Sequence, residues 1–184
     1  MVPAICMSRK SMLKCMLGLF VICAYLFSYG HTQAATGVCT DGLVAYWNFN
    51  TGAQDFSNNG RNGTLVGQTN FATGGINLSG ALFDGAGDGI TVTDHNSLDF
   101  TTGLTMEMWI FSQDTNAGFP LNKIGTGNFG KYSIYRANAA DAAYGCYLNE
   151  AVVGLSLLAT QVDNNEWFHL VCTYDGSQFK MFKD

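Results

Sequence analysis

The sequence predicts an all-β domain, built as a sandwich or barrel of short strands. Turn-forming clusters rich in Asn, Asp and Gly recur about every ten residues, and short runs rich in aromatic and β-branched residues lie between them. A long apolar pattern with the 3.6-residue period of a helix is absent. The nearest candidate, residues 151–158, is short, β-branched and interrupted by glycine.

Nine runs are expected to be strands: 43–48, 64–66, 81–83, 89–92, 104–111, 131–136, 145–148, 167–174 and 179–182. The clearest is 104–111, where Leu, Met, Met and Ile fall on one face and Thr, Glu, Trp and Phe on the other. One apolar face and one mixed face indicate a strand in a sheet whose outer side is partly covered.

The N-terminal segment, residues 1–34, is predicted to be a helical signal peptide. Arg9, Lys10 and Lys14 precede an apolar run over 15–27, and about 13 apolar residues are too few to span a bilayer comfortably. Small residues follow, and we expect cleavage after Ala34. An uncleaved N-terminal anchor is the alternative. Residues 35–41 then form a short lead, and one domain extends over 42–184.

Charge and localisation follow from this cleavage. All 14 acidic residues lie after residue 34, whereas three of the nine basic residues precede it, so the mature chain carries 6 − 14 = −8. That charge disfavours nucleic acid and anionic membranes as partners. We expect a secreted or cell-surface protein without stable membrane insertion after cleavage.

Three cysteines remain in the mature chain, namely Cys39, Cys146 and Cys172. An odd number in a secreted protein allows at most one disulfide within the chain. Cys146–Cys172 is the candidate pair. A partner beyond Asp184 and isolated buried thiols are the alternatives.

Four segments carry a family resemblance: 43–47 with the loop 55–60, 81–85 followed by 88–92, 97–100 leading to 104–110, and 167–171 with 173–176. Their order and spacing resemble the laminin G-like, concanavalin A-like domains. The resemblance implies two packed antiparallel sheets in a jelly roll over 42–184. The chain departs from the family at its end, where a hairpin strand stops at Asp184, so we expect the last strands to be missing.

The loop after the first expected strand is the candidate metal site. Asp55, Ser57 and Asn58 look like the family's calcium loop, and carboxylate and amide oxygens in a flexible turn suit calcium. The alternative is an Asx-turn in which Asp55 caps backbone N–H groups without metal. The run 84–89 lacks the ligand pattern of an EF-hand and is expected to be a tight hairpin.

Catalytic chemistry is not expected. The only glutamates are Glu107, Glu150 and Glu166, and no strand carries the closely spaced carboxylates that glycoside hydrolysis needs. The two histidines left after cleavage, His95 and His169, stand in no recognisable zinc or triad pattern.

The sequence therefore predicts a secreted, non-catalytic binding module for carbohydrate or an extracellular protein, with calcium as a structural cofactor. Four tyrosines near loops, where binding residues concentrate, are expected at the surface, where their rings could stack on sugars: Tyr132, Tyr135, Tyr144 and Tyr147. The three tryptophans are expected in the core. The alternative functions are a structural or adhesive spacer of a larger surface protein and an accessory module of a secreted glycoside hydrolase.

Overall fold

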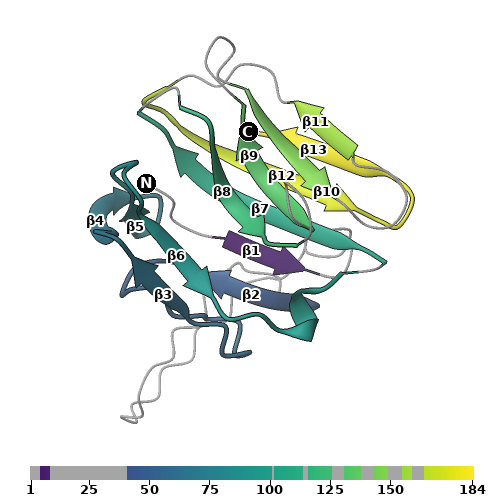
Figure 1. Ribbon diagram of the computed structural model, residues 1–184, viewed down its shortest axis with the longest axis horizontal. Helices are drawn as coiled ribbons and strands as arrows, with labels where there is room; N and C mark the ends of the chain where they lie inside the picture. The colour runs from purple at the N-terminus through teal and green to yellow at the C-terminus, as the bar shows by residue number, and fades with distance from the viewer. Residues whose placement is uncertain are drawn as a thin grey trace, which may run out of the picture.

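Two antiparallel β-sheets face each other and enclose the hydrophobic core (Figure 1). The computed structural model describes residues 5–8, 41–100, 102–113, 116–125, 131–137, 143–148, 155–158 and 164–184. This arrangement confirms the expected all-β, two-sheet jelly-roll sandwich.

The first sheet has five strands in the order β13-β12-β7-β1-β2, and all its pairs are antiparallel. Its strands are β1 (Ile5–Ser8), β2 (Leu43–Trp47), β7 (Leu104–Phe111), β12 (Trp167–Tyr174) and β13 (Phe179–Lys183). The long pair β7 and β12 is aligned along eight residues and forms its centre.

The second sheet has four strands in the order β11-β10-β9-β8. Its strands are β8 (Gly118–Lys123), β9 (Tyr132–Arg136), β10 (Tyr144–Leu148) and β11 (Leu155–Leu158). Two separate two-stranded ladders, β3–β6 and β4–β5, lie beside the sandwich (Figure 1). Their strands are β3 (Gly63–Val66), β4 (Asn70–Gly75), β5 (Leu78–Leu82) and β6 (Gly89–Val92).

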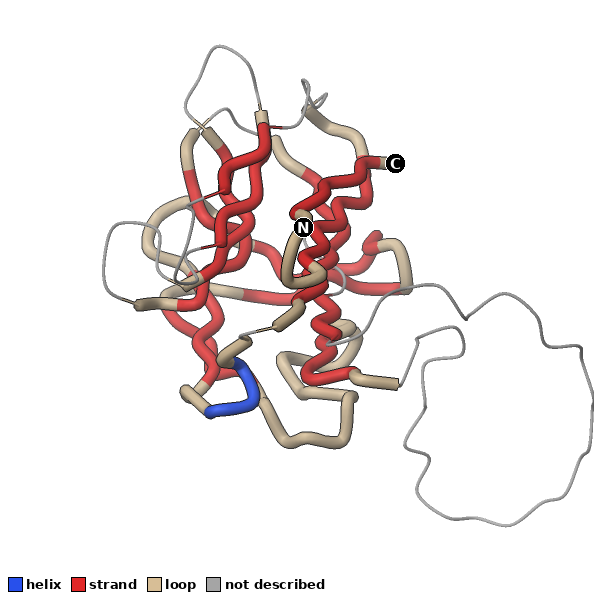
Figure 2. The backbone as a smooth tube through the Cα atoms, turned by 90° about the vertical axis from the view of Figure 1, so that its right-hand side faces the viewer, coloured by secondary structure: helices blue, strands red, loops and turns tan. Residues whose placement is uncertain are grey.

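The helical element among the described residues is one 3₁₀ turn, η1 (Asn96–Leu98), drawn in blue in Figure 2. Within the same part of the chain, no helix has the length and apolar character needed to cross a membrane.

The core forms because alternate residues of each strand point between the sheets. On β7, Met106, Met108 and Ile110 are almost fully buried, whereas Glu107 and Trp109 between them are half-buried on the outer face. The second sheet contributes buried residues such as Ile134 and Cys146 to the same cluster. The alternation seen in the sequence therefore assigns the faces of β7 correctly.

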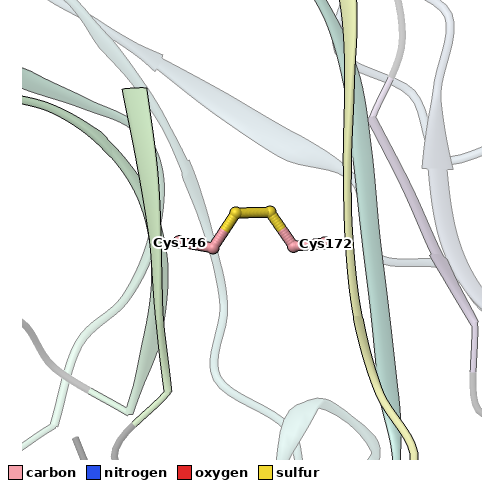
Figure 3. Close-up of a disulfide and its surroundings, with 2 residues drawn as sticks. All are labelled: Cys146 and Cys172. Atoms are coloured by element: carbon pink, nitrogen blue, oxygen red, sulfur yellow. A yellow bond between two sulfur atoms is a disulfide. The ribbon is translucent and has the colours of Figure 1, made fainter. Parts of the chain in front are cut away.

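A disulfide joins the two sheets. Cys146 on β10 and Cys172 on β12 reach across the core, with their Cα atoms 6.3 Å apart (Figure 3). This confirms the candidate pair among the alternatives. Because the bond closes a loop of 26 residues, the chain-entropy model assigns it a stabilisation of about 3.5 kcal/mol.

Most expected strands are present, and β7, β12 and β6 have the expected bounds. Besides β1, three strands were not predicted from the sequence, namely β4, β8 and β11. β4 and β8 lack a clear alternation, and β8 contains Pro120, which removes one backbone donor and argues against a strand. β11 falls within 151–158, which the sequence left unassigned, and it is a strand because β10 offers a free edge to pair with.

The expected helical leader is wrong for residues Ile5–Ser8, which form strand β1. They pair antiparallel with β2 on one side and with β7 on the other, and this supplies the hydrogen bonds that both strands need there. The rest of the leader, residues 9–34, lies outside the described residues.

Candidate functional site

The loop after β2 is organised by one carboxylate, that of Asp55. Its Oδ1 accepts hydrogen bonds from the backbone N–H groups of Tyr46 (3.0 Å) and Ser57 (2.8 Å). Its Oδ2 accepts from the Ser57 hydroxyl (2.8 Å) and from the backbone N–H of Arg61 (2.8 Å). The carboxylate therefore ties the start and the end of the loop to β2.

The tip of this loop turns through left-handed backbone conformations at Asn58 (φ 68°) and Gly60 (φ 70°). Asparagine and glycine tolerate this conformation best, which explains the residue types. Between them, the Asn59 side-chain amide donates to the backbone carbonyls of Leu43 (3.1 Å) and Val44 (3.0 Å). The tip is thus fastened to β2 by a second set of bonds.

The fixed loop directs the Arg61 guanidinium toward the segment that leads into η1. Its Nε and Nη2 donate to the hydroxyl of Ser97 at 3.2 and 2.8 Å, and Nη2 also lies 3.0 Å from His95 Nδ1. Its Nη1 donates to the Asn59 carbonyl at 2.8 Å. Arg61, His95 and Ser97, the Arg61 cluster, join two loops that lie more than thirty residues apart in sequence.

The contacts of His95 determine its tautomer. Its Nδ1 accepts a hydrogen bond from the backbone N–H of Ser97 at 3.1 Å, and this bond caps η1. Nδ1 also lies within hydrogen-bond distance of Arg61 Nη2, and a guanidinium nitrogen can only donate. Nδ1 must therefore carry a lone pair, and the ring proton lies on Nε2. The exposed ring edge presents an N–H donor.

Two lysines in or next to the second sheet form ion pairs with the aspartates that flank η1. Lys123 on β8 pairs with Asp94 and lies 3.7 Å from Asp99, and Lys131 lies 2.6 Å from Asp99. The ammonium of Lys123 holds the pKa of Asp94 below its usual value, through a hydrogen bond first and through its charge second. Asp94 is therefore ionised at neutral pH and held by a partner.

A buried tyrosine holds the end of η1 through a hydrogen bond and a ring contact. The Tyr132 hydroxyl donates to the backbone carbonyl of Leu98 at 3.0 Å, and its ring packs against Phe100. Burial raises the pKa of Tyr132, and the nearby charges of Asp99 and Asp94 add to the effect. The phenol consequently keeps its proton and remains a donor.

Two shallow pockets have members of the Arg61 cluster in their linings. One has a volume of about 230 Å³ and is lined by Gly42, Leu43, Val44, Asn59 and Ser97. The other has a volume of about 190 Å³ and is lined by Gly60, Arg61, Asn62, Val92, Thr93, Asp94 and His95. Both linings include residues of the two joined loops. The first pocket offers the Asn59 amide and the Ser97 hydroxyl, and the second offers guanidinium, imidazole and carboxylate groups from Arg61, His95 and Asp94.

The structure gives Asp55, Ser57 and Asn58 roles that need no metal. All of the contacts to Asp55 described above come from N–H and O–H donors, which is the Asx-type capping named as the alternative. Among the described residues, no group of three or more His, Cys, Asp or Glu is placed to hold a metal ion. This donor set does not by itself form a calcium shell, and calcium binding stays a prediction.

The four tyrosines divide between core and surface. Tyr132 and Tyr144 are each 2% exposed, and Tyr144 packs edge-on against Phe168. The expectation that they lie at the surface is wrong because the register of β9 and β10 directs both rings into the core. Tyr135 and Tyr147 are half-buried on the other face of the sheet, and ligand binding by them stays a prediction.

The outer face of the five-stranded sheet carries aromatic residues. Trp109 stacks on His169 with ring centroids 4.9 Å apart, and Phe111 lies 5.4 Å from Trp167. Glu107 Oε2 lies 3.9 Å from His169 Nε2. Of the three tryptophans expected in the core, Trp47 is buried, whereas Trp109 and Trp167 are half-buried on this outer face.

The sequence reasoning missed the Arg61 cluster. Arg61 carries no motif, and His95 was considered only for zinc or triad chemistry. The one local signal was a His two residues before a Ser at the start of a short turn, which is compatible with a cap but is common in loops. Only the pairing of two distant loops reveals the cluster.

Comparison with known proteins supports the family. A laminin G family model, described as the concanavalin A-like lectin/glucanases superfamily, matches residues 84–184, which is 101 of the 184 residues. No curated protein and no solved structure matches the chain. Because the match covers more than half of the chain and the two antiparallel sheets agree with it, this protein belongs to the concanavalin A-like lectin/glucanases superfamily.

Proposed function

We propose that this protein is a secreted, non-catalytic module that binds carbohydrate at the two pockets beside the Arg61 cluster. The observation that carries the proposal is that Asn59, Arg61, Asp94 and His95 line two pockets formed in part by the same two loops. Planar polar groups of this kind give and accept the directional hydrogen bonds that sugar hydroxyls require.

The size of the pockets supports a sugar ligand. Volumes of about 230 and 190 Å³ are below the range of about 300–1,000 Å³ typical of sites for larger small molecules. The hydrogen bonds of Asp55 and Asn59 hold the walls in place before a ligand arrives, which lowers the ordering cost of binding.

The chemistry of the site supports binding without reaction. Asp94 is the carboxylate on the pocket wall, and its pairing with Lys123 keeps it ionised. A glycosidase needs a second carboxyl about 5–10 Å away, one of the two holding a proton. Asp94 held as an anion is suited to accepting hydroxyl hydrogens, and it is poorly suited to donating a proton to a leaving group.

A glycan array with the folded full chain tests the proposal. Binding to a defined glycan class is expected, and Arg61→Ala should weaken it at least about tenfold because charge-assisted hydrogen bonds contribute about 1.5–3 kcal/mol. His95→Gln, which removes the ring donor, should weaken the same interaction. Asp55 is left unchanged in this experiment because it supports the fold of the loop.

The matched control is Lys180→Ala, which removes an exposed cation from β13 on a different part of the chain. It should leave affinity unchanged. A folded protein that binds no glycan, or binding that survives both Arg61→Ala and His95→Gln, would refute the proposal. Incubation of the protein with any glycan it binds, followed by product analysis, tests the absence of hydrolysis.

A second candidate function, recognition of an extracellular protein, is favoured by the outer aromatic face. Trp109 and Trp167 are residue types that dominate protein interfaces, and they lie half-buried around His169. Trp109→Ala would weaken such binding and leave the glycan pockets intact. Arg61→Ala would have the opposite pattern, so the two variants separate the two functions.

A further inference from the structure

The second pocket of the candidate site, lined by residues 60–62 and 92–95, is rich in hydrogen-bond donors. We call it the Arg61 pocket. The side chains of Arg61, Asn62 and His95 all belong to its lining, and the other contacts of each one show whether it can donate or accept there. Their roles decide which kind of ligand group the pocket can hold.

Asn62 presents its amide nitrogen, because its amide oxygen is already in use. The backbone N–H of Asp55 donates to Asn62 Oδ1 at 2.9 Å, and only the oxygen of an amide side chain can accept that bond. The Asn62 nitrogen therefore carries two N–H donors, and no residue that the structure describes accepts from them. Since Asn62 is exposed, a ligand in the pocket can use both.

His95 and Arg61 add further donors. The lone pair on His95 Nδ1 leaves the ring proton on Nε2, and nothing in the described part of the chain accepts it. The Arg61 guanidinium donates only to uncharged groups, namely a hydroxyl, a carbonyl and the neutral imidazole. Within the described ranges, no carboxylate lies within 4.0 Å of its nitrogens, so its charge has no direct ionic partner.

The two carboxylates closest in sequence to these groups have partners of their own. Asp94, which also lines the pocket, forms an ion pair with Lys123. The oxygens of Asp55 accept the four N–H and O–H bonds that fix the loop. The Arg61 pocket therefore combines one unpaired positive charge with three donor side chains.

We propose that the Arg61 pocket binds the anionic group of an acidic sugar, either a carboxylate or a sulfate ester. Such a group offers only acceptors, which matches the three donor side chains, and its hydrogen bonds to a guanidinium are about twice as strong as neutral ones. The Asp94 carboxylate can accept from a hydroxyl of the same sugar. Because the anionic group belongs to a glycan, this step rests on the proposed carbohydrate binding and narrows it to acidic glycans.

The test compares acidic glycans with their neutral counterparts, using the full chain. Oligosaccharides that contain glucuronate or galacturonate are presented beside their carboxyl-reduced forms, and sulfated oligosaccharides beside their desulfated forms. Dissociation constants are measured by surface plasmon resonance for every glycan that binds. In at least one pair the acidic form should bind at least about tenfold tighter, because its hydrogen bonds are charge-assisted. The uronate and sulfate pairs together identify which anionic group the pocket takes.

Asn62→Asp tests whether this preference arises in the Arg61 pocket. The substitution keeps an oxygen for the backbone N–H of Asp55 and replaces the two amide donors by a negative charge. It should abolish the tenfold preference for the acidic form. Asn77→Asp, which adds the same charge at the exposed turn between β4 and β5, is the matched control and should keep the preference. If circular dichroism shows that Asn62→Asp is unfolded, Arg61→Gln replaces it, and the same loss is expected.

The possible failures are distinguishable. Equal or tighter binding of the neutral form in every pair would overturn the acidic-glycan proposal and leave carbohydrate binding intact. A preference for acidic forms that survives in the folded pocket variant would place the anionic group elsewhere on the molecule, which also overturns the proposal. Binding of no glycan at all, acidic or neutral, would refute the proposed carbohydrate binding itself.

Discussion

Replacement of Asp55 by alanine should destabilise the domain by about 3 kcal/mol. The carboxylate accepts bonds from the backbone N–H groups of Tyr46, Ser57 and Arg61, and each is worth about 1 kcal/mol net in a partly exposed loop. Asp55→Asn should cost only about 1 kcal/mol. Its remaining oxygen can keep the bonds from Tyr46 and Ser57, whereas the amide nitrogen cannot accept the Arg61 N–H.

Urea unfolding monitored by tryptophan fluorescence measures the two losses. Asp84→Ala is the matched control, because the Asp84 carboxylate is exposed and accepts from the backbone N–H of Ala86 in a similar short turn. It should cost less than about 1 kcal/mol. A loss below about 1 kcal/mol for Asp55→Ala would refute the capping argument.

The same proteins test calcium. If calcium binds at Asp55, Ser57 and Asn58, it should raise the melting temperature of the wild type and leave that of Asp55→Ala unchanged. Equal melting of the wild type with calcium and with a chelator would refute the calcium prediction and leave the capping role intact.

Three further predictions concern other parts of the molecule. Loss of the disulfide in Cys146→Ala/Cys172→Ala should lower the free energy of unfolding by about 3.5 kcal/mol, and a loss below about 1 kcal/mol would contradict the entropic argument. Gly67→Ala should cost about 2 kcal/mol or more, because φ is +69° and the new Cβ would lie 2.5 Å from Asp88 Oδ1. Gly89→Ala, whose Cβ would meet nothing within 4 Å, is its control and should stay within about 0.5 kcal/mol. Backbone N–H groups of Gln178 and then Ser177 hold the pKa of Asp175 below its ordinary 3.8. The stability advantage of the wild type over Asp175→Ala should therefore be full above pH 3.8 and disappear as the pH falls below it, measured by urea unfolding at a series of pH values.

The sequence was most informative where the signal was local. Alternation along 104–111 assigned both faces of β7 because successive side chains of a strand point to opposite sides. The turn between β12 and β13 is local in the same way: Asp175 accepts hydrogen bonds from the backbone N–H groups of Ser177 and Gln178, and Gly176 adopts φ 94°.

The sequence was least informative where two distant segments had to meet. Tyr132 and Tyr135 lie three residues apart on β9, and only the pairing with β10 determines which ring points into the core. β8 and β11 became visible only as partners of β9 and β10. Strand pairing is a long-range property, and short-range composition carries little record of it.

The sequence by itself determined the all-β class, the long strands and the family, because each depends on residue type and spacing along the chain. It left Asp55 open between a calcium ligand and a capping carboxylate. The tertiary structure decided which of the cysteine alternatives formed, where Arg61 meets His95 and Ser97, and which segment pairs with both β2 and β7. Those outcomes depend on strand register and on the need of buried backbone groups for partners, and both are settled only when the whole chain has packed.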